Sequence, residues 1–264
     1  IVYGLRGLCY IQVEVTGPNR DLHSGQYGGA VYNPIQALSE MLASLKDSNG
    51  HVTVPGFYDK VIALDEAERA RIAAIPYTEE GFLQETGVPG VWGEAGYTVR
   101  ERVTARPTLE INGIWGGFQG EGPKTVLPAK AGAKISCRLV ANQDHYEIAD
   151  ILQKHLKQIA PPEVTVETKR LHGGHGALID VTSKYMQAAA RVLEETFGNP
   201  PVYEREGGSI PVVATFQTEL GIDSVMLGYG LPDDNLHSPD ERFYLPNFYG
   251  GIDATIKFLS EIAK

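Results

Sequence analysis

The order of apolar patterns in the first two-thirds of the chain restricts its fold more than any other feature. Residues 9–15 alternate apolar and polar side chains, which is typical of a half-buried strand. Residues 34–45 follow with apolar side chains at helical spacing, with Asn33 as the expected N-cap and Pro34 in the first turn. Four more segments are expected: strands at 108–114 and 131–140, a helix at 145–159 and a strand at 163–171. The order β-α-β-β-α-β predicts a ferredoxin-like split unit.

An irregular stretch, residues 51–107, interrupts this unit. It carries prolines, glycines and acidic runs, with one short charged helix candidate at residues 65–74 and no sustained apolar period. We interpret the stretch as an insertion within a first domain of residues 1–172.

The remaining residues, 173–264, alternate helical and apolar segments. The expected elements are helices at 183–197, 211–219 and 247–262 and a buried strand at 223–229. This alternation indicates an α/β class, but so few strands do not complete a sheet. The sequence therefore predicts an α+β first domain, a boundary near 171–174 and an incomplete α/β second domain.

Composition narrows the classes of partner. The net charge of −10 and the absence of a basic cluster argue against nucleic-acid binding. No segment approaches the roughly 20 apolar residues of a membrane span, and the start lacks a signal-peptide pattern. Cys9 and Cys137 lie in apolar alternating runs and are expected to be buried free thiols, which favours a cytoplasmic location. The chain begins at Ile1 without an initiator Met, which we interpret as the start of a fragment.

Two His-Ser pairs lie in polar, turn-forming surroundings, where an imidazole can face a ligand instead of a core. His23 is followed by a Gly-rich segment, and His237 follows an acidic turn at 233–235. From the residues alone, His237 is more simply a loop histidine beside acidic residues. His23 is equally well explained as a turn histidine that bonds local backbone.

The motifs around both histidines, in this order, resemble the carnosinase and cytosolic dipeptidase branch of the aminoacylase/carboxypeptidase superfamily of two-metal exopeptidases. The likeness covers essentially the whole chain and includes residues 3–7, 54–59, 124–128, 138–140 and 207–211. Members of that family carry most metal ligands and the catalytic Glu in a long segment that precedes the part matching Ile1. The resemblance implies a lid and dimerisation domain followed by the C-terminal part of a zinc-peptidase catalytic domain. The chain alone is then expected to be inactive.

The resemblance also implies roles for six residues. His237 matches a ligand of one of two divalent metals, which zinc suits best and manganese or cobalt also fits. Asp240 or Glu241 is a candidate to fix its tautomer. His23 matches the histidine that crosses the dimer interface and stabilises the oxyanion of the partner's reaction.

The other four matches concern the substrate. Arg138 matches the residue that grips the substrate's carboxylate, and a structural ion pair is its alternative. Thr125, Ser209 and Gly208 match the surroundings of that carboxylate, and each hydroxyl is otherwise a turn-stabilising group. The Gly207–Gly208 turn also presents N–H groups that suit an anion.

His172 and His175 match no ligand of the family and are expected at the hinge between the domains. Glu206 is not assigned the catalytic base. Two hypotheses follow for this sequence. The parent protein is a dipeptidase or amidohydrolase acting on a small peptide or N-acyl amino acid as a homodimer, or the chain is a non-catalytic dimerisation module.

Overall fold

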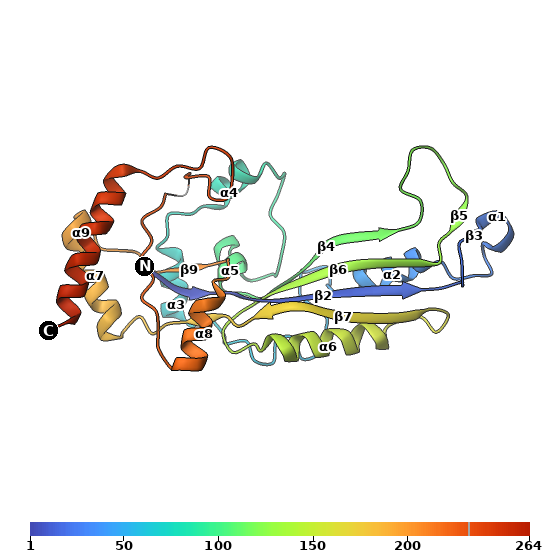
Figure 1. Ribbon diagram of the computed structural model, residues 1–264, viewed down its shortest axis with the longest axis horizontal. Coiled ribbons are helices and arrows are strands. Elements are labelled where there is room, and N and C mark those ends of the chain that lie inside the picture. The colour runs from blue at the N-terminus through green and yellow to red at the C-terminus, as the bar shows by residue number, and fades with distance from the viewer. Residues whose placement is uncertain (232) are drawn as a thin grey trace.

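The computed structural model describes residues 1–231 and 233–264. The molecule is elongated, with a long four-stranded sheet at one end and helices α7 (Lys184–Phe197) and α9 (Leu245–Ile262) at the other (Figure 1). A smaller sheet and a group of short helices lie between these ends.

The predicted ferredoxin-like unit is confirmed in the four-stranded sheet. Its strands are β2 (Gly7–Thr16), β4 (Thr108–Gly116), β6 (Lys130–Leu139) and β7 (Thr165–Gly174), in the spatial order β4-β6-β2-β7. All neighbours are antiparallel, and β2 pairs with β6 from Gly7↔Leu139 to Thr16↔Lys130. The last strand in sequence therefore lies beside the first, as the split unit requires.

Two helices, α2 (Pro34–Ala43) and α6 (His145–Gln158), pack on this sheet. Alternate residues of β2, such as Ile11 and Val13, are fully buried beneath them, while the residues between point to the other face and stay partly exposed. Both helices start at side-chain caps, because Asn33 accepts from the N–H of Ile35 and Asp144 accepts from two N–H groups of the first turn of α6.

The strand expected at 163–171 extends to Gly174, so His172 lies inside the sheet opposite Tyr10. Their rings stack with centroids 5.1 Å apart. His175 follows immediately after the strand, so only this second histidine lies in the connection between the two sheets.

The insertion forms three short helices: α3 (Glu66–Ala73), α4 (Glu79–Thr86) and α5 (Val99–Thr104). Polar bonds tie it to the smaller sheet. The Tyr3 hydroxyl donates to Glu68 at 2.7 Å, Arg205 pairs with the same carboxylate, and Arg100 pairs with Glu204. The insertion is therefore docked onto the middle of the molecule and is more than a surface loop.

The smaller sheet contains β8 (Ala177–Leu178), β1 (Val2–Leu5) and β9 (Glu204–Glu206), in that spatial order. The sequence pattern did not predict these strands, because they are only two to four residues long. The first residues of the chain thus pair with residues from its second half. The division at 172/173 stays a prediction.

The prediction of a buried strand at 223–229 is wrong. This segment makes a single antiparallel bridge, Val2↔Met226, and its apolar residues are half-buried. Among the described residues the segment joins no sheet, because β1, which carries Val2, is already flanked by β8 and β9. The expected helices at 211–219 and 247–262 are present as α8 (Pro211–Leu220) and α9. Across the described residues, the structure contains no helix that is both long and apolar enough to cross a bilayer.

Candidate functional site

Arg138 and Ser209, which the sequence analysis assigned to one substrate group, lie in contact. Arg138 is at the end of β6 on the face of the sheet away from α2 and α6, and Ser209 lies in the turn between β9 and α8. Arg138 Nη1 donates to Ser209 Oγ at 2.8 Å, although 71 residues separate them in the sequence. Gly208, the third predicted member, is the neighbour of Ser209 and is exposed.

Arg6 joins this group, although the sequence analysis gave it no role. It lies between β1 and β2, two residues before Leu8, which pairs with Arg138 across the sheet. Its guanidinium Nε donates to the carbonyl of Gly207 at 2.9 Å, and its own carbonyl accepts from Ser209 Oγ at 2.6 Å. The only sequence signal was its place in the motif at residues 3–7.

The charge of this group is unbalanced. Among the described residues, no carboxylate lies within 4.0 Å of the guanidinium of Arg6 or of Arg138, whereas Arg106 and Arg205 each have a carboxylate partner. Burial, and then the nearby Arg138 cation, lower the pKa of Arg6 to about 10. Glu110 acts on Arg6 only as a more distant negative charge. Two guanidinium groups in partly dehydrated surroundings, without a contacting carboxylate among the described residues, make a place that favours an anion.

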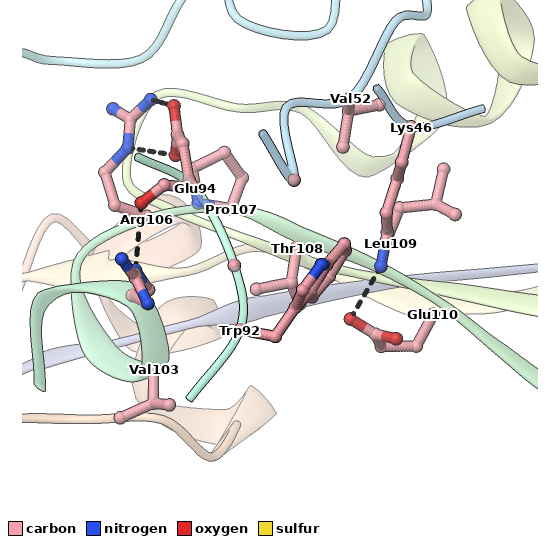
Figure 2. A pocket seen from close by; sticks show the side chains of 13 residues that line it. Lys46, Val52, Trp92, Glu94, Val103, Arg106, Pro107, Thr108, Leu109 and Glu110 are labelled. Atoms are coloured by element: carbon pink, nitrogen blue, oxygen red, sulfur yellow. Dashed lines mark hydrogen bonds and ion pairs between the residues drawn. The ribbon is translucent and has the colours of Figure 1, made fainter. Parts of the chain in front are cut away.

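A nearby cavity contains two cations that are paired with carboxylates. It has a volume of about 160 Å³ and lies where the insertion meets β4 (Figure 2). Arg106 makes two bonds to the Glu94 carboxylate, at 2.8 and 2.6 Å, and Lys46 pairs with Glu110 at 3.1 Å beside the Trp92 ring (Figure 2). Arg102 also lines the cavity and donates to the carbonyl of Glu94 at 2.9 Å. Two of the three cations of the cavity are thus paired with carboxylates, and the Arg6–Arg138 group is the stronger candidate site.

His23 and Thr125 form a second group. His23 ends the short strand β3 (Leu22–His23), which pairs with β5 (Val126–Leu127), and the N–H of Ser24 donates to the carbonyl of Thr125 at 3.1 Å. The imidazole is exposed, and its Nδ1 accepts from the N–H of Gly25 at 3.0 Å, so it caps the four-residue helix α1 (Ser24–Tyr27). The local capping role that the sequence left open is thus present, and Nε2 is left for another partner.

The two groups lie at opposite ends of the long sheet (Figure 1). Leu8 on β2 is level with Arg138, while the group of His23 lies past Thr16 at the other end of the same strand. Eight residues of strand span about 26 Å at about 3.3 Å each. Within one chain, His23 and Thr125 therefore do not reach a ligand held by Arg138.

His237 belongs to neither group. It lies in the mostly exposed segment 233–244 and has a φ of 61°, a left-handed conformation that occurs in turns. Nearby, buried Asp234 accepts from the N–H of Leu231 and Arg242 pairs with Asp233. Neither Asp240 nor Glu241 hydrogen-bonds His237 among the described residues, so the suggested tautomer-fixing partner is not observed.

The residues present do not complete a metal site. In the part of the chain that the structure describes, no three His, Cys, Asp or Glu side chains come together as a metal would need. His237 is an exposed imidazole and belongs to no such group among those residues. The residues that the structure describes therefore do not by themselves fit a resident metal ion.

The fold is a two-layer α+β unit, and its candidate site contains a pair of arginines suited to an anion. Comparison with known protein families shows to which class a chain with this fold belongs. The peptidase dimerisation domain of the M20 family matches residues 3–164, more than half of the chain. The chain belongs to this family.

Among curated relatives, the Cys-Gly metallodipeptidase dug1 of Schizosaccharomyces pombe is 33% identical over 100% of this chain and 56% of its own length. The Beta-Ala-His dipeptidase of Homo sapiens is 31% identical over 100% of this chain and 53% of its own length. The chain thus spans about half the length of the curated relatives it matches.

Solved structures agree. The di-peptidase Dug1p from Saccharomyces cerevisiae superposes with a TM-score of 0.80 at 33% identity, over 98% of this chain and 55% of that one. The M20 family metallo-carboxypeptidase Sso-CP2 from Sulfolobus solfataricus gives a TM-score of 0.86 at 29% identity, over 98% and 59%. The resemblance drawn from the sequence motifs is confirmed at the level of family and fold.

Proposed function

We propose that this chain is the lid and C-terminal part of a metal-dependent dipeptidase that acts as a homodimer. The observation that carries the proposal is the contact between Arg138 and Ser209 beside Arg6, with no carboxylate in contact with either guanidinium in the part of the chain that the structure describes. The free carboxylate of a small peptide or an N-acyl amino acid supplies the missing charge, since a guanidinium donates two parallel bonds to such a group.

The separation of His23 from Arg138 supports a shared site. In a two-fold dimer, the exposed imidazole at the far end of one sheet is free to reach the ligand bound by the partner copy. A protonated imidazole placed there acts on negative charge that develops on the carbonyl oxygen during hydrolysis. Because Thr125 lies beside His23, it also lies at the partner's site in this dimer.

The metal ligands belong, in this proposal, to polypeptide outside the 264 residues, with His237 as one further ligand and zinc as the preferred ion. Apolar side chains left exposed on α8 and α9, among them Phe216, Leu220 and Leu259, suit packing against that further polypeptide. A cytoplasmic location is part of the proposal, because Cys9 and Cys137 are both free thiols.

Mixed dimers of the complete polypeptide test the shared site. His23→Ala and Arg138→Gln copies, co-expressed with different tags, are each expected to be nearly inactive as homodimers. The purified heterodimer contains one site with both native residues, so we expect about half of the wild-type dipeptidase activity.

The matched control places both substitutions in one copy and pairs it with a wild-type copy. A shared site predicts an almost inactive heterodimer here, because the intact Arg138 faces the partner's Ala. The reverse pattern, with this control half-active and the first heterodimer inactive, contradicts the proposal.

A second function concerns the 264 residues taken alone. The family match is to a dimerisation domain, and the described residues assemble no metal site. We propose that the isolated chain pairs but does not hydrolyse dipeptides. Assay with added zinc, manganese or cobalt checks this, and turnover above that of the free ions contradicts it.

A further inference from the structure

The hydroxyl of Ser209 has only one possible arrangement of hydrogen bonds. It lies 2.8 Å from Arg138 Nη1 and 2.6 Å from the carbonyl oxygen of Arg6. A guanidinium nitrogen only donates and a carbonyl oxygen only accepts. The hydroxyl therefore accepts from Arg138 and gives its single proton to Arg6, which leaves no proton for a bound carboxylate.

Arg6 fixes the turn that carries this hydroxyl. Its N–H donates to the carbonyl of Gly208 at 3.1 Å, and its Nε donates to the carbonyl of Gly207 at 2.9 Å. Together with the bond from Ser209, three consecutive residues of the turn are held by one arginine.

The other side of the turn is closed by the insertion. A Cβ on Gly207 would lie 2.6 Å from the carbonyl oxygen of Val103 and 3.2 Å from Arg6 Nη2, so only glycine fits between them. Arg6 Nη1 also reaches the carbonyl of Arg106 at 3.5 Å. The turn has little freedom to move away from Arg138.

We infer that Arg6 and Ser209 are positioning residues of the carboxylate site: Arg6 holds the turn, Ser209 orients Arg138, and the ligand's carboxylate takes its bonds from Arg138 instead of from the Ser209 hydroxyl. The inference rests on the proposed function for the nature of the ligand. It changes the role expected of Ser209, from a direct contact of the substrate to a support for Arg138.

A double-mutant cycle on the 264-residue chain distinguishes the two roles. Binding of N-acetylglycine is measured by NMR titration of the arginine Nε–H signals, with N-acetylglycinamide as the ligand that lacks a carboxylate. We expect the acid to bind and the amide not to bind.

Ser209→Ala is expected to weaken acid binding about tenfold, which is the value of one hydrogen bond to a charged group. In the Arg138→Lys background the same change is expected to weaken acid binding less than about twofold, because lysine lacks the forked guanidinium that Ser209 orients. Ser209→Thr, which keeps the hydroxyl, restores binding. An equal loss from Ser209→Ala in both backgrounds overturns the inference, because it means direct contact with the ligand.

Arg6→Lys keeps the charge but loses the forked bonds to the turn, and we expect about tenfold weaker binding. Arg191→Lys, on the exposed face of α7, is the matched control and should bind as the wild type does. Wild-type affinity in Arg6→Lys overturns the role of Arg6. If that variant does not fold, the Ser209 cycle still decides the question.

These results are separate from the mixed-dimer experiment. A wild-type chain that binds neither ligand overturns the inference whatever the complete protein hydrolyses. Acid binding that is unchanged in Ser209→Ala and Arg6→Lys also overturns it, while the proposed dipeptidase activity stands.

Discussion

Three arginines of this chain, Arg6, Arg106 and Arg138, differ in the kind of group that they bond. Arg106 is buried and makes two bonds to Glu94, so it holds the end of the insertion in place. Among the described residues, Arg138 bonds to a serine hydroxyl and the Arg6 guanidinium bonds to carbonyl oxygens, and neither contacts a carboxylate. The proposed carboxylate site rests on this feature: arginines whose hydrogen bonds are satisfied but whose charge has no contacting carboxylate among the described residues.

The two cysteines give a prediction at the same scale. Cys9 and Cys137 face each other across β2 and β6 in the core, and burial raises the pKa of the Cys9 thiol to about 12. Because the thiolate is the reactive form, neither should react with Ellman's reagent at pH 8 in the native chain. Both should react in concentrated urea. Rapid labelling of the native chain, measured by absorbance, contradicts this packing.

The elements depend on each other through a few polar contacts. Glu68 of α3 is the centre of one such contact, since it accepts from Tyr3 of β1 and Arg71 and pairs with Arg205 of β9. Burial by itself raises the pKa of Glu68, but the bonds from Arg71 and Tyr3 outweigh it and lower the pKa below the ordinary value. The insertion is thereby fastened to the smaller sheet.

Acid unfolding tests this contact. Because the folded pKa of Glu68 is lowered, its contribution is present above the unfolded pKa and is lost as the pH falls through the folded value. We expect Glu68→Gln to lose about 2 kcal/mol of unfolding free energy at pH 7, with a smaller difference near pH 3. Urea titration of both proteins at pH 7 and pH 3 measures this difference in unfolding free energy.

Glu66→Gln is the matched control, because Glu66 is an exposed residue of the same helix. It should change the unfolding free energy by less than about 0.5 kcal/mol at either pH. A loss for Glu68→Gln that is equal at pH 7 and pH 3 contradicts the ionic role of Glu68.

At the scale of the whole molecule, the long sheet sets the distance between the two groups of predicted site residues. β2 runs from the level of Arg138 to the level of the His23 group, and α2 and α6 cover one face of the sheet along its length. The sheet therefore keeps the Arg138 group and the His23 group of one chain at a fixed distance from each other. A second copy is the simplest way to bring both groups to one ligand.

Light scattering of the complete polypeptide checks this arrangement. We expect a molar mass of twice that of one copy at micromolar concentration, as a symmetric dimer requires. A monomer at concentrations where dipeptides are hydrolysed contradicts the shared site and leaves His23 as a helix cap alone.

The sequence by itself determined the split β-α-β-β-α-β unit, the helix start at Asn33, and the family, because these depend on local periodicity and on motifs that persist along the chain. It also placed Arg138 and Ser209 in one group. It did not predict β1, β8 and β9, and it expected a buried strand at 223–229, since a short strand is defined by its neighbours in space and not by its own pattern. Only the tertiary structure decided the orientation of the Ser209 hydroxyl, the contacts of Arg6 with the turn at 207–209 and the distance between Arg138 and His23. Each of these depends on contacts between residues far apart in the sequence, which no local pattern encodes.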